Sequence, residues 1–214
     1  MTDRPIPFSP LMVRAILREI AKPGTGKTQT RRHLTGACDD PPAFIADGVV
    51  TALDANDRGY RWPRTHGVGD RLWVKEAWRT GRAYDDLSPS EMSGEEPIQY
   101  EAGPIRLPLQ DGRYRHARFM PRWASRITLL VTDVRVERLQ NISEDDAEAE
   151  GWPAPQDRAK TGIAEIRDAY PIGWYAALWE SLHGPGSWEA NPFVAVYGFR
   201  PVLANIDNME AAHG

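Results

Sequence analysis

The chain has 214 residues, a mass of 24.0 kDa and a formal net charge of -4. This length suits one domain with a substantial core, and 41% hydrophobic and 26% charged residues are ordinary for a globular protein. The negative charge excludes a general attraction to nucleic acid, so such contacts would need local basic patches. Cys38 is the only cysteine, which excludes an internal disulfide, and the apolar runs are too short to span a bilayer. We therefore expect a soluble, cytoplasmic protein without a membrane partner.

Apolar spacing and capping signals predict helices over residues 9–21, 143–151 and 173–183, with a further helix expected over 157–170. Ser9 is a good N-cap and Pro10 suits the first turn, while Pro23 and Gly24 end that helix. Ser143 is also an N-cap, and three acidic residues after it favour the positive end of a helix. The last helix carries an apolar stripe: Trp174, Tyr175, Leu178, Trp179 and Leu182.

Alternation of apolar and polar residues predicts strands over 69–78, 98–100, 105–109, 127–139 and 193–199, and a hairpin over 43–53 that turns at Asp47-Gly48. In the strand over 127–139 the alternation breaks at Thr132-Asp133, which indicates a bulge or bend. Residues 80–97 are rich in Ser, Pro, Gly and acidic residues, which is typical of a long loop of low order. The tail over residues 205–214 is expected to fray.

The stretch from Gly24 to Arg32 has two interpretations. Residues 21–28 end in Gly-Lys-Thr at the spacing of a phosphate-binding loop. Such a loop must follow a buried strand and open a helix, whereas here a helix precedes it, so a P-loop NTPase is the least favoured interpretation. Alternatively, Lys27 and Thr30 form a reactive pair, brought together either by a helical turn or by a bend in an extended backbone.

Several ordered blocks together resemble the ASCH domain of the PUA-like superfamily, including its phage and prophage members. The blocks are Lys-Thr-x-Thr-x-Arg at 27–32, Gly-Asp-x-Leu-x-Val at 69–74, the central strand, Ser-Glu-x-x-Ala-x-x-Glu-Gly at 143–151, and the closing aromatic strand. The resemblance implies an α+β fold with a small mixed β-barrel and flanking helices. It implies one domain over residues 1–204, with insertions near 80–97 and 153–170. One departure is Thr25, where the family pattern has glycine.

Some members of this family are N4-acetylcytidine amidohydrolases, and their catalytic residues match Lys27, Thr30 and Glu150. The resemblance therefore implies hydrolysis of N4-acylated cytosine nucleosides or nucleotides without a metal. Our hypothesis is that Lys27, its pKa lowered by burial and nearby arginines, is the base for the Thr30 nucleophile. Glu150 would then protonate the leaving amine.

The residues expected to bind the substrate supply charge, hydrogen bonds or stacking surfaces: Arg31, Arg32, Lys75, Glu76, Trp78, Tyr100, Trp123 and Trp188. The histidines and Cys38 lack metal-ligand spacing, so no metal or other cofactor is expected. Two further alternatives remain open. One is a non-catalytic RNA-binding module that contacts phosphate through Arg31, Arg32, Arg122 and Arg126, and the other is a single-strand ribonuclease.

Overall fold

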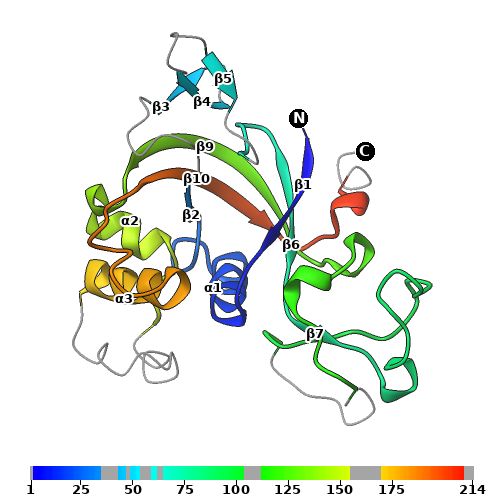
Figure 1. The fold of residues 1–214 in the computed structure, drawn as a ribbon. Helices are drawn as coiled ribbons and strands as arrows, with labels where there is room; N and C mark the ends of the chain where they lie inside the picture. Colours follow the sequence, from blue (N-terminus) through cyan, green and yellow to red (C-terminus); the bar gives the residue numbers. More distant parts are fainter. Residues whose placement is uncertain are drawn as a thin grey trace.

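The computed structural model describes residues 2–34, 43–46, 49–53, 59–61, 65–103, 112–154 and 170–209. Its main element is a five-stranded sheet with the strand order β1-β6-β9-β10-β2 (Figure 1). The bounds of these strands are Asp3–Pro7 for β1, Arg71–Lys75 for β6, Thr128–Arg138 for β9, Phe193–Val202 for β10 and Gln29–His33 for β2. β1 pairs with β6 in parallel and the other three pairings are antiparallel, so the sheet is mixed.

The three predicted helices that lie in the described residues are confirmed. α1 spans Pro10–Ala21, with the Ser9 side chain accepting a hydrogen bond from the Met12 amide. α2 spans Glu144–Ala149 and begins with a capping box of Ser143 and Asp146. α3 spans Pro171–His183 and is followed by Gly184 at a φ of 97°. The helix expected over 157–170 falls almost entirely outside the described residues.

The predicted bulge in the longest strand is confirmed. β9 pairs with β10 residue by residue, but Gly198 faces Asp133 while Phe199 faces Val131. Thr132 is therefore the extra residue that has no partner on β10. The bulge increases the local twist, and Figure 1 shows β9 and β10 arching together over the helices.

Two small sheets accompany the main one. β3 (Ala43–Ala46), β4 (Val49–Leu53) and β5 (Gly59–Arg61) form an antiparallel sheet, which confirms the strands of the predicted hairpin. Its turn at 47–48 lies outside the described residues, as does the strand predicted over 105–109. β7 (Trp78–Arg79) and β8 (Gln99–Tyr100) form the other sheet.

The α+β class is confirmed, but the expected small mixed β-barrel is wrong for the described part of the chain, where the main sheet is not closed. The five-stranded sheet stays open, with β1 and β2 as its two edges. α1 connects these edges, and Figure 1 shows it on the inner side of the arch between them. The buried side chains Met12, Val13 and Ile16 of α1 belong to the same core as the strands. The helix therefore occupies the space that the two edges would need in order to pair.

Two expectations of low order are corrected. The loop over residues 80–97 is packed, because the Glu96 carboxylate accepts hydrogen bonds from the amides of Ser93 (2.8 Å) and Gly94 (2.9 Å). The tail was expected to fray after residue 204, which is wrong as far as residue 209. The Asn205 side-chain amide donates to three backbone carbonyls of residues 122–125, at 2.8–3.1 Å. Ile206 is fully buried in the next turn, so an apolar anchor holds the tail.

Candidate active site

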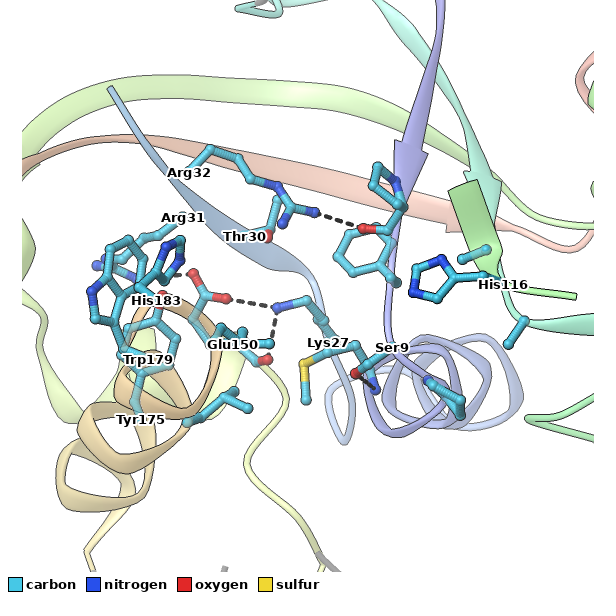
Figure 2. A pocket seen from close by; sticks show the side chains of 18 of the residues that line it. Ser9, Lys27, Thr30, Arg31, Arg32, His116, Glu150, Tyr175, Trp179 and His183 are labelled. Atoms are coloured by element: carbon cyan, nitrogen blue, oxygen red, sulfur yellow. Dashed lines mark hydrogen bonds and ion pairs between the residues drawn. The ribbon is translucent and has the colours of Figure 1, made fainter. Parts of the chain in front are cut away.

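A cavity of about 320 Å³ opens between α1, α3 and the inner face of β2 (Figure 2). Its lining comes from segments far apart in the chain: the end of β1, β2, residues 114–117, the end of α2, and α3. The predicted catalytic residues Lys27, Thr30 and Glu150 all line it, together with Arg31 and Arg32. The fold therefore brings the five residues of the two most informative sequence blocks into one site.

Lys27 enters this cavity from a backbone clamped between two helices. Its amide donates to Ala15 of α1 at 3.0 Å, and the next amide donates to Ala149 of α2 at 2.9 Å. Gly26 leaves no room for a side chain, since a Cβ there would lie 2.3 Å from the Ala15 carbonyl oxygen. The glycine that this turn requires is thus Gly26, and Thr25 is tolerated at the position where the family pattern has glycine.

Lys27 and Glu150 form a buried ion pair at the base of the cavity. Lys27 Nζ donates to Glu150 Oε2 at 2.6 Å and to the Glu150 carbonyl oxygen at 2.7 Å. Only 1% of Lys27 and 2% of Glu150 is exposed. Burial lowers the pKa of the Lys27 ammonium, as expected, although the charge and hydrogen bond of Glu150 oppose that shift.

Arg31 holds the other oxygen of this carboxylate. Its guanidinium donates to Glu150 Oε1 at 3.3 Å, to Glu137 at 2.6 Å and to Asp146 at 3.1 Å. The Arg31 side chain is fully buried, so its charge is balanced by acids rather than by water. Arg31 therefore positions Glu150 and has little capacity left to bind a ligand.

Thr30 lies on β2, where it pairs with Tyr197 of β10. It is 3% exposed, and what remains accessible faces the cavity. The described residues provide no hydrogen-bond partner for its hydroxyl, and Figure 2 shows Thr30 on the same side of the cavity as Arg32, across from Lys27. Thr30 thus presents a hydroxyl group to any molecule that enters the cavity that Lys27 also lines.

Aromatic side chains that the sequence did not single out as ligand contacts form the walls. Tyr175, Trp179 and His183 of α3 lie on one side and His116 lies on the other (Figure 2), and Phe8 also lines the cavity. The rings of Trp179 and His183 stack at a centroid distance of 4.1 Å. Burial, and then the charges of His33 and Arg32, lower the pKa of His183, which keeps its imidazole neutral near pH 7.

Six of the residues expected to bind the substrate lie elsewhere: Lys75, Glu76, Trp78, Tyr100, Trp123 and Trp188. Trp78 is fully buried in a second core cluster, where its ring meets Trp123 edge to face at 6.3 Å. Glu76 accepts two hydrogen bonds from Arg126, at 2.8 and 2.9 Å. The interpretation of Trp78 as a stacking surface is therefore wrong, because no base can reach its ring.

The other three are also engaged in the fold. The Tyr100 hydroxyl donates to the Ala124 carbonyl at 3.0 Å. Lys75 donates to the Arg118 carbonyl, and Trp188, which does not line the cavity, packs edge to face against Tyr175 at 6.4 Å. Residue type had suggested that these groups bind a ligand, but each has a partner in the protein.

The phosphate-binding-loop interpretation is contradicted. Lys27 precedes a strand, β2, and the amides that would hold a phosphate already hold a carboxylate. Glu19 of α1 accepts hydrogen bonds from the amides of Gly24 (2.9 Å), Thr25 (3.1 Å) and Gly26 (2.8 Å). This internal anion occupies the turn and leaves no donors for a nucleotide.

Two of the four arginines proposed for an RNA-binding module lie outside the cavity and in ion pairs. Arg122 binds Asp3 at 2.7 Å and Asp207 at 2.6 Å, and Arg126 binds Glu76 at 2.8 Å. A phosphate would have to displace these carboxylates. The RNA-binding alternative therefore gains no support from Arg122 and Arg126.

Comparison of the chain with protein-family models, curated proteins and solved structures finds no match. Among the residues that the structure describes, no group of three or more His, Cys, Asp or Glu side chains could hold a metal ion. In the same part of the chain, no helix has the length and apolarity needed to cross a membrane. The geometry of the cavity is thus the main evidence for function.

Proposed function

We propose that the protein hydrolyses the amide bond of N4-acetylcytidine or related N4-acylated cytosine nucleosides, without a metal. The observation that carries this proposal is the buried contact of 2.6 Å between Lys27 and Glu150, in a cavity that also receives the Thr30 hydroxyl. A base, a nucleophile and an acid are the three groups that amide hydrolysis needs. The resemblance of the sequence blocks to ASCH amidohydrolases supports the same assignment.

The ion pair of Lys27 and Glu150 contains one proton that can move between the two side chains, and the proposed mechanism depends on this transfer. When that proton moves from Lys27 Nζ to Glu150 Oε2, the pair becomes a neutral amine and a carboxylic acid. Burial penalises the charged form of Lys27, because the ammonium loses the solvation that water would provide. The lowered pKa of Lys27 is in the direction that this transfer requires. The neutral pair provides the base and the acid at the same time.

The first half of the reaction uses both members of this pair. Lys27 removes the proton from the Thr30 hydroxyl while Thr30 Oγ1 bonds to the acyl carbon. As the bond between that carbon and N4 breaks, Glu150 gives its proton to the departing amino group of cytosine. The products of this half are an acyl ester on Thr30, a Lys27 ammonium and a Glu150 carboxylate.

Water completes the cycle by the reverse proton movements. Glu150 accepts a proton from the water molecule whose oxygen attacks the ester carbon. Lys27 returns its proton to Thr30 Oγ1 as the ester bond breaks, and the carboxylic acid leaves. The amine and the acid are then restored, so the cycle consumes one water molecule and needs no other reactant.

The size and walls of the cavity agree with a single nucleoside. A volume of about 320 Å³ is at the lower end for small-molecule sites, which range over roughly 300–1,000 Å³. The exposed imidazole of His183, which stacks on the buried Trp179 ring, provides a flat surface for a pyrimidine. Tyr175 and Phe8 add apolar surface for the acyl group and the base.

The test is incubation of the protein with N4-acetylcytidine and chromatographic measurement of cytidine. Thr30→Val keeps the shape of the side chain but removes the nucleophile, so we expect turnover to fall by at least about 10³-fold. Thr132→Val is the matched control, since Thr132 is an exposed threonine on β9. Full turnover by Thr30→Val would refute the mechanism, and a parallel incubation with a single-stranded oligoribonucleotide tests the ribonuclease alternative.

A further inference from the structure

Among the residues that the structure describes, three cationic side chains line the cavity, and one of them forms no ion pair with a carboxylate. Lys27 is paired with Glu150, and Arg31 is paired with three acids. Arg32 makes a single hydrogen bond, from Nη2 to the Pro7 carbonyl at 3.1 Å. Within the described part of the chain, no carboxylate forms an ion pair with it, and Nε and Nη1 donate to no residue. Among the described residues, Arg32 is thus the cavity cation that forms no ion pair and keeps unused hydrogen-bond donors, although the charge of Glu150 also acts on it.

The protein holds this guanidinium in place. The Pro7 carbonyl accepts one of its N–H groups, and the guanidinium lies over the Phe8 ring at 5.0 Å from the centroid (Figure 2). The backbone at Phe8 is fixed in turn, because its amide donates to the Lys75 carbonyl at 3.0 Å. The orientation of the charge is thus set by β1 and β6 before any ligand enters.

The position of Arg32 relative to Thr30 follows from strand geometry. The two residues are two apart on β2, so their side chains leave the same face of the strand, with Cα atoms about 7 Å apart. Arg31, between them, is directed at the acids Glu150, Glu137 and Asp146 instead. A carbonyl group attacked by Thr30 therefore has its oxygen within range of the longer Arg32 side chain.

We infer that Arg32 binds the acyl carbonyl oxygen of the substrate and stabilises the negative charge that this oxygen acquires when Thr30 attacks. The inference rests on the proposed function. It assigns a separate role to each arginine, since Arg31 positions the acid while Arg32 contacts the reacting group. Preorganised donors aimed at a developing oxyanion are among the largest contributors to catalysis, and loss of one costs about 10²–10³-fold in turnover.

The experiment compares the kinetics of the intact protein with those of Arg32→Met and Arg32→Lys on N4-acetylcytidine. We expect kcat of Arg32→Met to fall by about 10²–10³-fold with little change in KM, because the charge on oxygen develops only in the transition state. Arg32→Lys keeps the charge but not the planar fork, so its kcat should lie between the two. Arg200→Met is the matched control, an exposed arginine on β10 that does not line the cavity.

A chemical rescue separates this role from a structural one. Free guanidinium ion added to Arg32→Ala should restore part of kcat, whereas it should not restore a variant that is only misfolded. The unfolding temperature of each variant identifies loss of structure. Unchanged kcat in Arg32→Met, a change in KM alone, or no rescue of a folded Arg32→Ala would overturn the inference. Absence of turnover by the intact protein would instead overturn the proposed function, and the inference with it.

Discussion

Replacement of Lys27 by Met tests the energetic basis of the site. The side chain is almost as long as lysine and fits an apolar environment, so the main change is the loss of a buried ammonium. Glu150 would lose two hydrogen bonds, those at 2.6 and 2.7 Å, and keep only the contact of 3.3 Å with Arg31. The variant therefore leaves a buried carboxylate with one weak charged partner.

Removal of one member of a buried ion pair costs about 3–5 kcal/mol. The remaining contact with Arg31 reduces this penalty, so we expect Lys27→Met to lose about 3 kcal/mol of unfolding free energy at pH 7. The double variant Lys27→Met/Glu150→Leu should regain most of this loss, because an apolar pair of similar volume pays no desolvation cost. Arg31 would still keep Glu137 and Asp146.

The assay is urea unfolding followed by tryptophan fluorescence, with the double-mutant cycle completed by Glu150→Leu. Lys22→Met is the matched control, since Lys22 is exposed and its replacement should change the unfolding free energy by less than about 0.5 kcal/mol. If Lys27→Met were as stable as the intact protein, or if the double variant were less stable than both single variants, the argument from the buried pair would be refuted.

Three further predictions concern the same region. Gly26→Ala should cost about 3 kcal/mol of unfolding free energy and lower the urea midpoint, because the new Cβ would lie 2.3 Å from a backbone oxygen of α1. An unchanged midpoint would contradict the close approach of residue 26 to α1. Partial burial opposes ionisation of Asp146, but the charge of Arg31 and several hydrogen bonds lower its pKa from 3.8 to about 2. The intact protein should therefore have an unfolding free energy about 2 kcal/mol higher than that of Asp146→Asn above pH 4. Thermal unfolding should show this difference disappear as the pH falls through about 2. The plot of turnover against pH should be bell-shaped. The midpoint of its alkaline limb should lie below pH 10.5, the usual pKa of lysine, because the pKa of Lys27 is lowered. An alkaline midpoint above pH 10.5 would exclude Lys27 as the group that shares a proton with Glu150.

The sequence predicted local structure well because local structure depends on neighbouring residues. The extra residue in β9 was visible as a break in alternation at Thr132, and the start of α2 was visible in the cap at Ser143. The open sheet was not predictable in this way, because closure depends on whether the distant edges β1 and β2 can meet. The resemblance to a barrel family suggested that these edges pair with each other. In the structure α1 packs between the edges, and the sheet stays open.

The walls of the cavity show a different limit of prediction. The apolar stripe of α3 was correctly identified, but periodicity does not distinguish a side chain that faces the core from one that faces a cavity. Trp174 is fully buried, whereas Trp179 and Leu182 of the same stripe line the site. In the same way, residue type does not distinguish a tryptophan in the core, such as Trp78, from an aromatic side chain that lines a cavity.

The position of Glu150 is the strongest argument that this region has a function other than stability. The residue ends α2, where the helix dipole disfavours a negative charge, and it is 2% exposed. Two cations must be buried to compensate it, and each of them carries its own desolvation cost. An apolar residue would fill the same space without Lys27 or Arg31 having to turn inward. Because folding alone gains so little from this arrangement, the arrangement supports the proposal that Glu150 and Lys27 share a proton in the cavity that Thr30 also lines.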